Sequence, residues 1–169
     1  MNNVLAFLNS YLSALGVPPN IKTINDRKRV QKAVYLAEAA GAKLGYDYNW
    51  YVYGPYSPRL ANDYYRLSEA ILDNEIPSGN EAANNQNIPK LKESILEKLQ
   101  SLAPIIEKPV GFDLAQEDWL ELTSSLHYLQ KVEHNDLTGA REVIARKKPH
   151  LSEYVDMAQA KLKEVNLLA

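Results

Sequence analysis

The chain has 169 residues, of which 46% are hydrophobic and 24% charged, and its formal net charge is −2. This composition is that of an ordinary globular protein, and no window contains the ~20 consecutive apolar residues that a membrane span needs. The absence of cysteine excludes disulfides, thiolate metal sites and thiol nucleophiles, and it fits a reducing compartment. We therefore expect a soluble cytoplasmic protein without a membrane partner.

Helical periodicity dominates the N-terminal segment. Apolar residues over 4–15 recur with the spacing of an amphipathic helix. A second helix is predicted to begin at a cap provided by Thr23 or Asn25 and to run to about Leu44, with Gly45 ending it.

The next segment changes character. Its aromatic and β-branched residues favour a short β element near residues 48–53. Ser57 and Pro58 then have the pattern of a helix start, which predicts a third helix over about 58–72. Residues 73–89 are rich in Asn, Glu, Gly and Pro and are interpreted as a mobile surface loop or an irregular hairpin.

Four further helices are predicted in the second half. One is ended by Pro104, and the next begins at a capping box formed by Asp113 and Gln116. A shorter helix has Asp136 as its cap, and the last has Ser152.

Together these elements predict a mainly α fold, a compact bundle of about seven helices with one short β element. The length is that of one domain, so residues 1–169 are interpreted as a single helical domain.

Candidate catalytic groups are few. Glu117 and Glu121 stand one helical turn apart and could act as paired acids, but such carboxylates usually form a solvated face. His127, His134 and His150 lack the spacing of a zinc site. Because no nucleotide-binding loop or nucleophile elbow is present either, we predict no enzymatic activity, no metal and no cofactor. A hydrolase or nuclease using Glu117, Glu121 or His127 is a minor alternative.

A basic cluster lies in the first turns of the predicted second helix: Arg27, Lys28, Arg29 and Lys32. Cations at a helix start oppose the helix dipole, so this cluster is a candidate contact for nucleic acid or an acidic protein. The alternative is a solvated face, or pairing with Asp26 and Glu38.

Tyrosine gives the strongest compositional signal, because seven of the 11 tyrosines fall within residues 46–65. Such rings serve either as core residues, whose hydroxyls then need partners, or as rigid anchors in interfaces. Both interpretations stay open. As a partner-binding surface, the candidates are Trp50, Tyr51, Tyr53, Tyr56 and Arg59.

Two motifs resemble a known family. The helix sequence RKRVQKAVYL at 27–36 and the sequence YVYGPYSPRL at 51–60 resemble the YwgA-like family, in which a "K-L-Q-K-hydrophobic-V-Y" helix precedes a "Y-G-P-Y-S" corner. The arrangement is similar to the related Panacea domains of phage-associated proteins and SocA-like antitoxins. In the corner, glycine permits an unusual backbone angle, the first proline fixes the turn, and Ser-Pro begins a helix; these structural residues are Gly54, Pro55, Ser57 and Pro58.

The resemblance implies a bacterial or phage protein that acts as a regulatory or antitoxin-like interaction module without catalysis, binding another protein. The alternative hypothesis is a DNA-binding transcriptional regulator with a helix-turn-helix-like arrangement, in which the basic cluster contacts phosphates. A homodimer is compatible with either hypothesis.

Overall fold

The computed structural model describes residues 3–77 and 90–169. Within them the chain forms eight α-helices, one 3-10 helix and one two-stranded antiparallel sheet, which confirms the predicted mainly α fold. In chain order the elements are α1 (Asn3–Leu15), α2 (Ile24–Ala39), β1 (Asn49–Tyr51), β2 (Gly54–Tyr56), α3 (Pro58–Leu72), α5 (Glu93–Ser101), α6 (Ala103–Ile106), α7 (Gln116–Lys131), α8 (Leu137–Lys147), η1 (Pro149–Tyr154) and α9 (Val155–Glu164).

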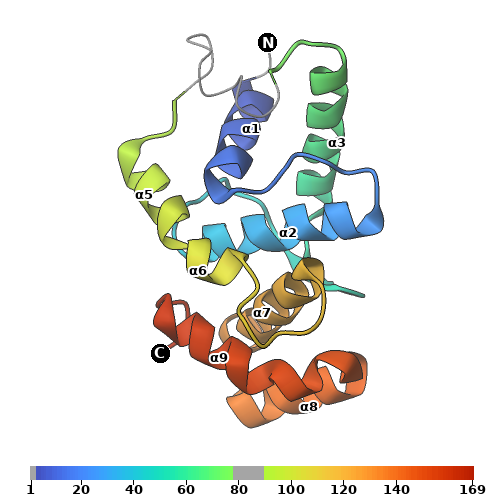
Figure 1. The fold of residues 1–169 in the computed structure, drawn as a ribbon, viewed down its shortest axis with the longest axis vertical. Coiled ribbons are helices and arrows are strands. Elements are labelled where there is room, and N and C mark those ends of the chain that lie inside the picture. The colour runs from blue at the N-terminus through green and yellow to red at the C-terminus, as the bar shows by residue number, and fades with distance from the viewer. Residues whose placement is uncertain (1–2, 78–89) are drawn as a thin grey trace.

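Helix α2 crosses the middle of the molecule (Figure 1). Helices α1, α3 and α5 lie on one side of it, and α7, α8 and α9 lie on the other. The closest pairing of elements is between α2 and α7, while α1 packs against α3 and α5, and α9 packs against α7. The buried apolar side chains of all these helices form one continuous cluster.

The two central helices are buried on every face. All residues from Val30 to Glu38 in α2 are buried, as are all residues from Trp119 to Leu129 in α7. A helix at the surface of a globular protein buries only a stripe. Polar side chains on α2 and α7 therefore lie inside the molecule, where they need hydrogen-bond or ionic partners.

Helix α2 begins as predicted but ends earlier. The Thr23 hydroxyl accepts from the Asp26 amide at 3.1 Å and the Asp26 carboxylate accepts from the Thr23 amide at 3.1 Å, forming a capping box. The predicted end near Leu44 is wrong. Gly41, at φ +104°, turns the chain, and the Ala42 amide bonds back to the helix.

The loop that follows folds over the end of α2 onto the Glu38 carboxylate. One carboxylate oxygen accepts from the amides of Leu44, Gly45 and Tyr46 at 2.8, 2.7 and 3.2 Å, and the other accepts from the Tyr48 hydroxyl at 2.9 Å. Burial and the nearby Glu38 charge raise the pKa of Tyr48. The loop thus takes its shape from one buried charge, and Glu38 does not pair with the basic cluster.

The predictions for the first and third helices are confirmed by α1 and α3, and Ser57 caps α3 by accepting from the Leu60 amide at 3.2 Å. The β element also lies where expected, although its second strand extends to Tyr56. Of the predicted mobile loop, residues 78–89 lie outside the described part of the chain.

The helix start predicted at Asp113 and Gln116 is wrong. Helix α7 follows Ala115, whose amide donates to the Asp118 carboxylate at 3.3 Å, whereas Gln116 accepts from the Lys108 amide at 2.8 Å. Asp113 and Gln116 therefore form no capping box. Pro104 does not simply end a helix either, because it lies in the first turn of the short α6, where proline is tolerated.

The last helix also begins differently. Asp136 caps α8 as predicted, accepting from the Gly139 amide at 2.7 Å. Ser152 does not cap the final helix, because it lies inside η1, and α9 starts only at Val155.

We predict that Glu38→Gln destabilises the protein by about 2 kcal/mol, because hydrogen bonds to a charged acceptor contribute more than those to a neutral one. Urea unfolding followed by circular dichroism measures the change. Glu69→Gln, at an exposed position of α3, is the matched control. Equal midpoints for the two variants would show that the Glu38 charge does not hold the loop.

Candidate partner-binding site

A short hairpin projects between the two central helices. Strands β1 and β2 pair with Trp50 opposite Pro55 and with Tyr51 opposite Gly54. Val52 and Tyr53 form the turn, and Gly54 follows at φ +94°. A non-glycine residue is strained at such an angle.

Lysines from two distant segments hold the hairpin backbone. The Lys32 ammonium of α2 donates to the Pro55 carbonyl at 2.6 Å, and the Lys148 ammonium after α8 donates to the Val52 carbonyl at 2.8 Å. Both lysines are almost fully buried, with 2% of each residue exposed. The hairpin is therefore fixed on both sides of its turn.

The corner between β2 and α3 is held by Gln31. Its side-chain amide donates to the Ser57 carbonyl at 2.8 Å and accepts from the Ser57 amide at 2.9 Å, as a neighbouring strand would. On the other side, Gly54 lies against α7 so closely that a Cβ atom there would be 2.3 Å from the Ser125 hydroxyl oxygen. The Gly-Pro-Tyr-Ser corner is thus a packed junction of α2, α7 and the hairpin.

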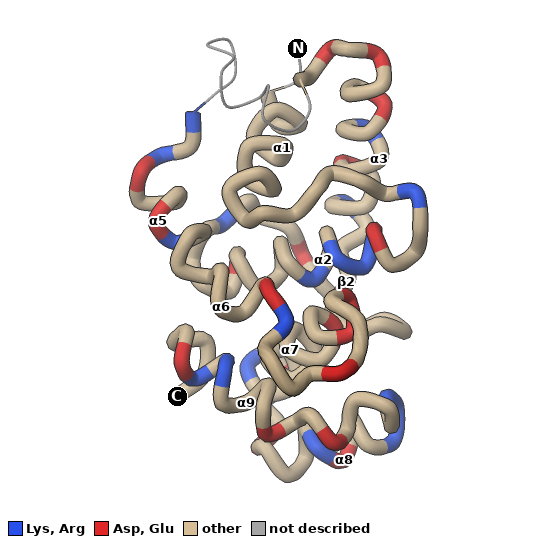
Figure 2. Tube along the Cα trace, in the orientation of Figure 1, with Lys and Arg blue, Asp and Glu red and all other residues tan. Residues whose placement is uncertain are grey.

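The basic cluster turns toward α7. Lys28 Nζ lies 2.7 Å from a Glu121 oxygen and 3.4 Å from Asp118, and Arg29 lies 3.0 Å from Glu117. Figure 2 shows these blue positions of α2 beside the red positions at the start of α7. The expectation of a solvated face, or of partners Asp26 and Glu38, is therefore wrong for Lys28 and Arg29.

Glu121 is the centre of a buried ionic network. Only 2% of the residue is exposed, and its second oxygen lies 3.3 Å from Lys148 Nζ. Burial lowers the pKa of Lys32 to about 7, although the charge of Glu121 opposes that shift; Lys148 and Lys28 add to the lowering. Burial also lowers the pKa of Lys148. Two ammonium groups, those of Lys28 and Lys148, thus pair with one buried carboxylate.

The candidate acids do not form a joint site with the histidine. Glu117 and Glu121 are occupied as ion-pair partners of α2, so they do not form the solvated face that was expected. His127 stands six residues further along α7, about 9 Å along the helix axis, and its Nδ1 lies 2.8 Å from the Tyr35 hydroxyl. Burial lowers the pKa of His127 to about 4.

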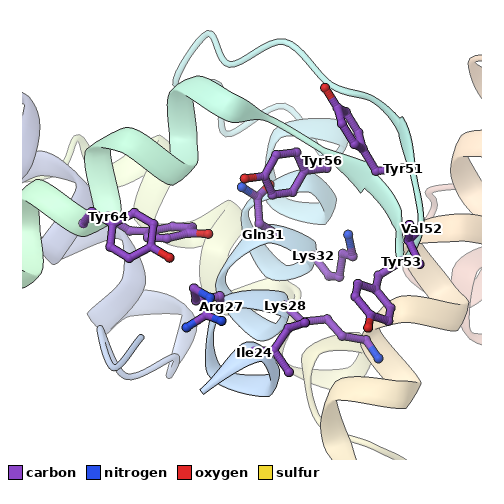
Figure 3. A pocket seen from close by; sticks show the side chains of 11 residues that line it. Ile24, Arg27, Lys28, Gln31, Lys32, Tyr51, Val52, Tyr53, Tyr56 and Tyr64 are labelled. Carbon is purple, nitrogen blue, oxygen red and sulfur yellow. The ribbon is translucent and has the colours of Figure 1, made fainter. Parts of the chain in front are cut away.

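A pocket of about 300 Å³ opens between α2, the hairpin and α3 (Figure 3). Helix α2 forms its floor, the hairpin forms one wall, and two tyrosines of α3 form the opposite wall. The lining residues are Ile24, Arg27, Lys28, Gln31, Lys32, Tyr51, Val52, Tyr53, Tyr56, Tyr64 and Tyr65.

Six of the predicted site residues meet in this pocket: Arg27, Lys28, Lys32, Tyr51, Tyr53 and Tyr56. Three others lie outside its lining. Trp50 packs against Tyr128 and under the Lys148 ammonium, and Arg59 donates to the Gly45 carbonyl at 2.6 Å. Arg29 pairs with α7, as described above.

Five lining residues were absent from the predicted site: Ile24, Gln31, Val52, Tyr64 and Tyr65. Tyr64 and Tyr65 belong to the tyrosine-rich segment 46–65, but they were not singled out as site residues. The signal that could have found Val52 is its place between two candidate tyrosines at a turn, where even an apolar side chain is solvent-facing.

No family model, no curated protein and no solved structure matches this chain. The resemblance to the YwgA-like family and to Panacea domains therefore stays a prediction. None of the described helices is both long and apolar enough to cross a membrane. Over residues 3–77 and 90–169, no three His, Asp or Glu side chains gather in a way that could hold a metal ion.

We predict that Gly54→Ala destabilises the protein by more than Gly16→Ala. Both positions have positive φ, but a Cβ atom at Gly16 meets nothing within 4 Å. Gly16→Ala should therefore cost only the backbone strain of about 1–2 kcal/mol, whereas Gly54→Ala adds the collision with Ser125. Urea unfolding measures both values.

Making Gly54→Ala in a Ser125→Ala background separates the cost of backbone strain from the cost of the collision with Ser125. There the added Cβ atom of Gly54→Ala would meet only ordinary contacts, so its cost should fall to that of Gly16→Ala. An undiminished cost in that background would contradict the close approach of the hairpin to α7.

Acid should destabilise the protein partly through His127. Its folded pKa of about 4 lies below the ordinary value of 6.5, so the unfolded chain binds the proton first and stability falls as pH drops below about 6.5. Between pH 7 and pH 5 this loss amounts to about 2 kcal/mol. Unfolding of His127→Gln at both pH values should show a correspondingly smaller loss than the parent protein. Exposed His150→Gln is the control, and an equal pH dependence for His127→Gln and the parent would contradict the expectation.

Proposed function

We propose that this protein is a non-catalytic interaction module that binds another protein at the hairpin and the adjoining pocket. One observation carries the proposal. Five of the ten large apolar or aromatic side chains that the described residues expose line this single pocket: Ile24, Tyr51, Val52, Tyr53 and Tyr65. Exposed apolar residues scattered singly need no explanation, whereas a group of them marks an interaction site.

The rigidity of the hairpin supports the same function. Its backbone is bonded to Lys32 and Lys148 and its corner to Gln31, so the tip does not need to be ordered when a partner arrives. Preorganised aromatic residues bind with a smaller entropic cost than mobile ones. Val52, with 81% of its surface exposed, stands at the tip.

The regulatory or antitoxin-like role is proposed from the resemblance to the YwgA-like and Panacea domains, and the cytoplasm is proposed as the compartment because the chain has no cysteine. For the alternative, DNA binding, the basic cluster offers less than its sequence suggests. Lys28 and Arg29 are paired with α7, and Lys32 donates to Pro55 inside the fold. Phosphate contacts by these side chains would have to compete with internal partners.

Affinity capture from the native cell extract, with and without nuclease, tests the proposal. The parent protein should retain a stoichiometric protein that survives nuclease treatment. Val52→Glu should lose at least nine tenths of it, because a charge at a desolvated interface position costs more than 1.4 kcal/mol, a factor of ten in affinity.

Val110→Glu is the matched control, since it introduces the same charge at a fully exposed valine outside the pocket. Equal capture by both variants would contradict the proposed surface. Retention of nuclease-sensitive nucleic acid in place of a protein would favour the DNA-binding alternative.

A further inference from the structure

The pocket combines apolar walls with a cationic floor. Five tyrosine rings, Ile24 and Val52 surround it, which suits a large apolar side chain. Its volume of about 300 Å³ is at the lower end for ligand pockets. The space therefore fits an anchor side chain of a peptide better than a large ligand.

The aromatic walls of the pocket are held in place by contacts with neighbouring side chains. The Lys28 ammonium lies 5.0 Å from the centroid of the Tyr53 ring, and Tyr51 and Tyr56 pack with centroids 4.8 Å apart. In Figure 3 Tyr53 stands on one side of the cavity, Tyr64 on the other, and Arg27 lies beneath Tyr64. An entering side chain would contact rings on both sides.

The lining contains three basic side chains, those of Arg27, Lys28 and Lys32, and no carboxylate. Arg27 is only half-buried, and its guanidinium donates to the backbone carbonyl of Ile21 at 3.0 Å. That carbonyl is neutral, so the charge of Arg27 is not cancelled by its hydrogen bond.

The charge beneath the pocket is also unbalanced. Lys28 and Lys148 pair with the buried Glu121, and Lys28 also lies near Asp118 at the edge of the group. These two lysines thus face two carboxylates, and the charge of Arg27, which pairs with neither, is in excess. A recess lined by one sign of charge concentrates ligands of the opposite sign.

On these grounds we propose that the pocket binds an acidic peptide segment of the partner. One large apolar side chain of the segment enters between Tyr53 and Tyr64, and a neighbouring carboxylate pairs with Arg27, while the charge of Lys28 adds to the attraction. This inference rests on the proposed function and specifies the chemistry of the partner. Apolar walls and excess positive charge together select such a segment, because neither an uncharged apolar peptide nor a purely acidic one satisfies both.

Selection from a random peptide library displayed on phage tests the inference with the full-length protein as bait. The enriched sequences should share one aromatic or large aliphatic residue with Asp or Glu beside it. A synthetic peptide of that consensus, labelled with a fluorophore, then gives affinities by fluorescence anisotropy.

Arg27→Gln should weaken binding of this peptide roughly tenfold, as expected for a partly desolvated charge pair. Arg27→Lys should keep most of the affinity. The matched control is Arg29→Gln, which removes a neighbouring cation of the same helix that does not line the pocket, and it should change affinity less than twofold. A second peptide with Asn and Gln in place of Asp and Glu should bind about tenfold more weakly and be insensitive to Arg27→Gln.

Several results would overturn the inference. Enriched peptides without acidic residues, or equal affinity for the parent and Arg27→Gln, would show that charge does not select the ligand. A dimer of the parent protein that Val52→Glu dissociates would also overturn the inference, because a second copy of the chain would then fill the pocket. Binding of a labelled single-stranded oligonucleotide in place of any peptide, lost in Val52→Glu, would assign the pocket to nucleic acid.

The failure of the inference and that of the proposed function have different signatures. If capture of a protein depends on Val52 but peptide affinity does not depend on Arg27, the proposed interaction module is supported and only the acidic-segment inference is contradicted. Capture that is unchanged by Val52→Glu removes the docking surface itself.

Discussion

The carboxylate of Glu121 connects parts of the chain that are far apart in the sequence. It lies between Lys28 of α2 and Lys148 at the end of α8, and Lys148 also reaches the backbone of the hairpin. Removal of the Glu121 charge would leave the Lys148 ammonium buried without its carboxylate partner, which typically costs 3–5 kcal/mol. An apolar interior of the same volume could be equally stable. Unlike apolar contacts, the buried ion pairs also fix the orientation of the segments that they join, because each ammonium group must point at a particular oxygen.

The motif residues gain a physical meaning from their contacts. Gln31 and Lys32 of the helix motif bind Ser57 and Pro55 of the corner motif, and Gly54 gives the corner room against α7. The two motifs thus contact each other directly and together hold the hairpin in place. The resemblance is carried by residues that hold the hairpin in place, whereas under the proposed function the rings that face the pocket contact the partner.

Sequence periodicity predicted the helices that have one buried face. For α1 and α3 the predicted ranges agree with the observed bounds. The same reasoning also predicted helices at α2 and α7. It missed the role of their charged residues, because these have the spacing of a solvated face while their partners lie on the other helix. Helix ends were missed where a glycine turn or a 3-10 segment replaced the expected cap.

The candidate site was also only partly predictable from the sequence. Tyr53, Tyr56 and the basic residues stood out through local composition, and the fold brings them together. Tyr64 and Tyr65 enter the pocket only because α3 folds back beside α2, and Lys148 supports the hairpin from 96 residues away. Contacts of that kind depend on the packing of whole helices, which local patterns in the sequence do not encode.

The distance of 96 residues between Val52 and Lys148 has a consequence for synthesis of the chain. A ribosome adds about 5–20 residues per second, so the hairpin leaves the exit tunnel roughly 5 to 20 seconds before the lysine that anchors its turn. During that interval the aromatic tip is attached to an incomplete scaffold. Under the proposed function, a nascent chain therefore cannot present the finished docking surface, and assembly with the partner would begin only after translation has passed α8.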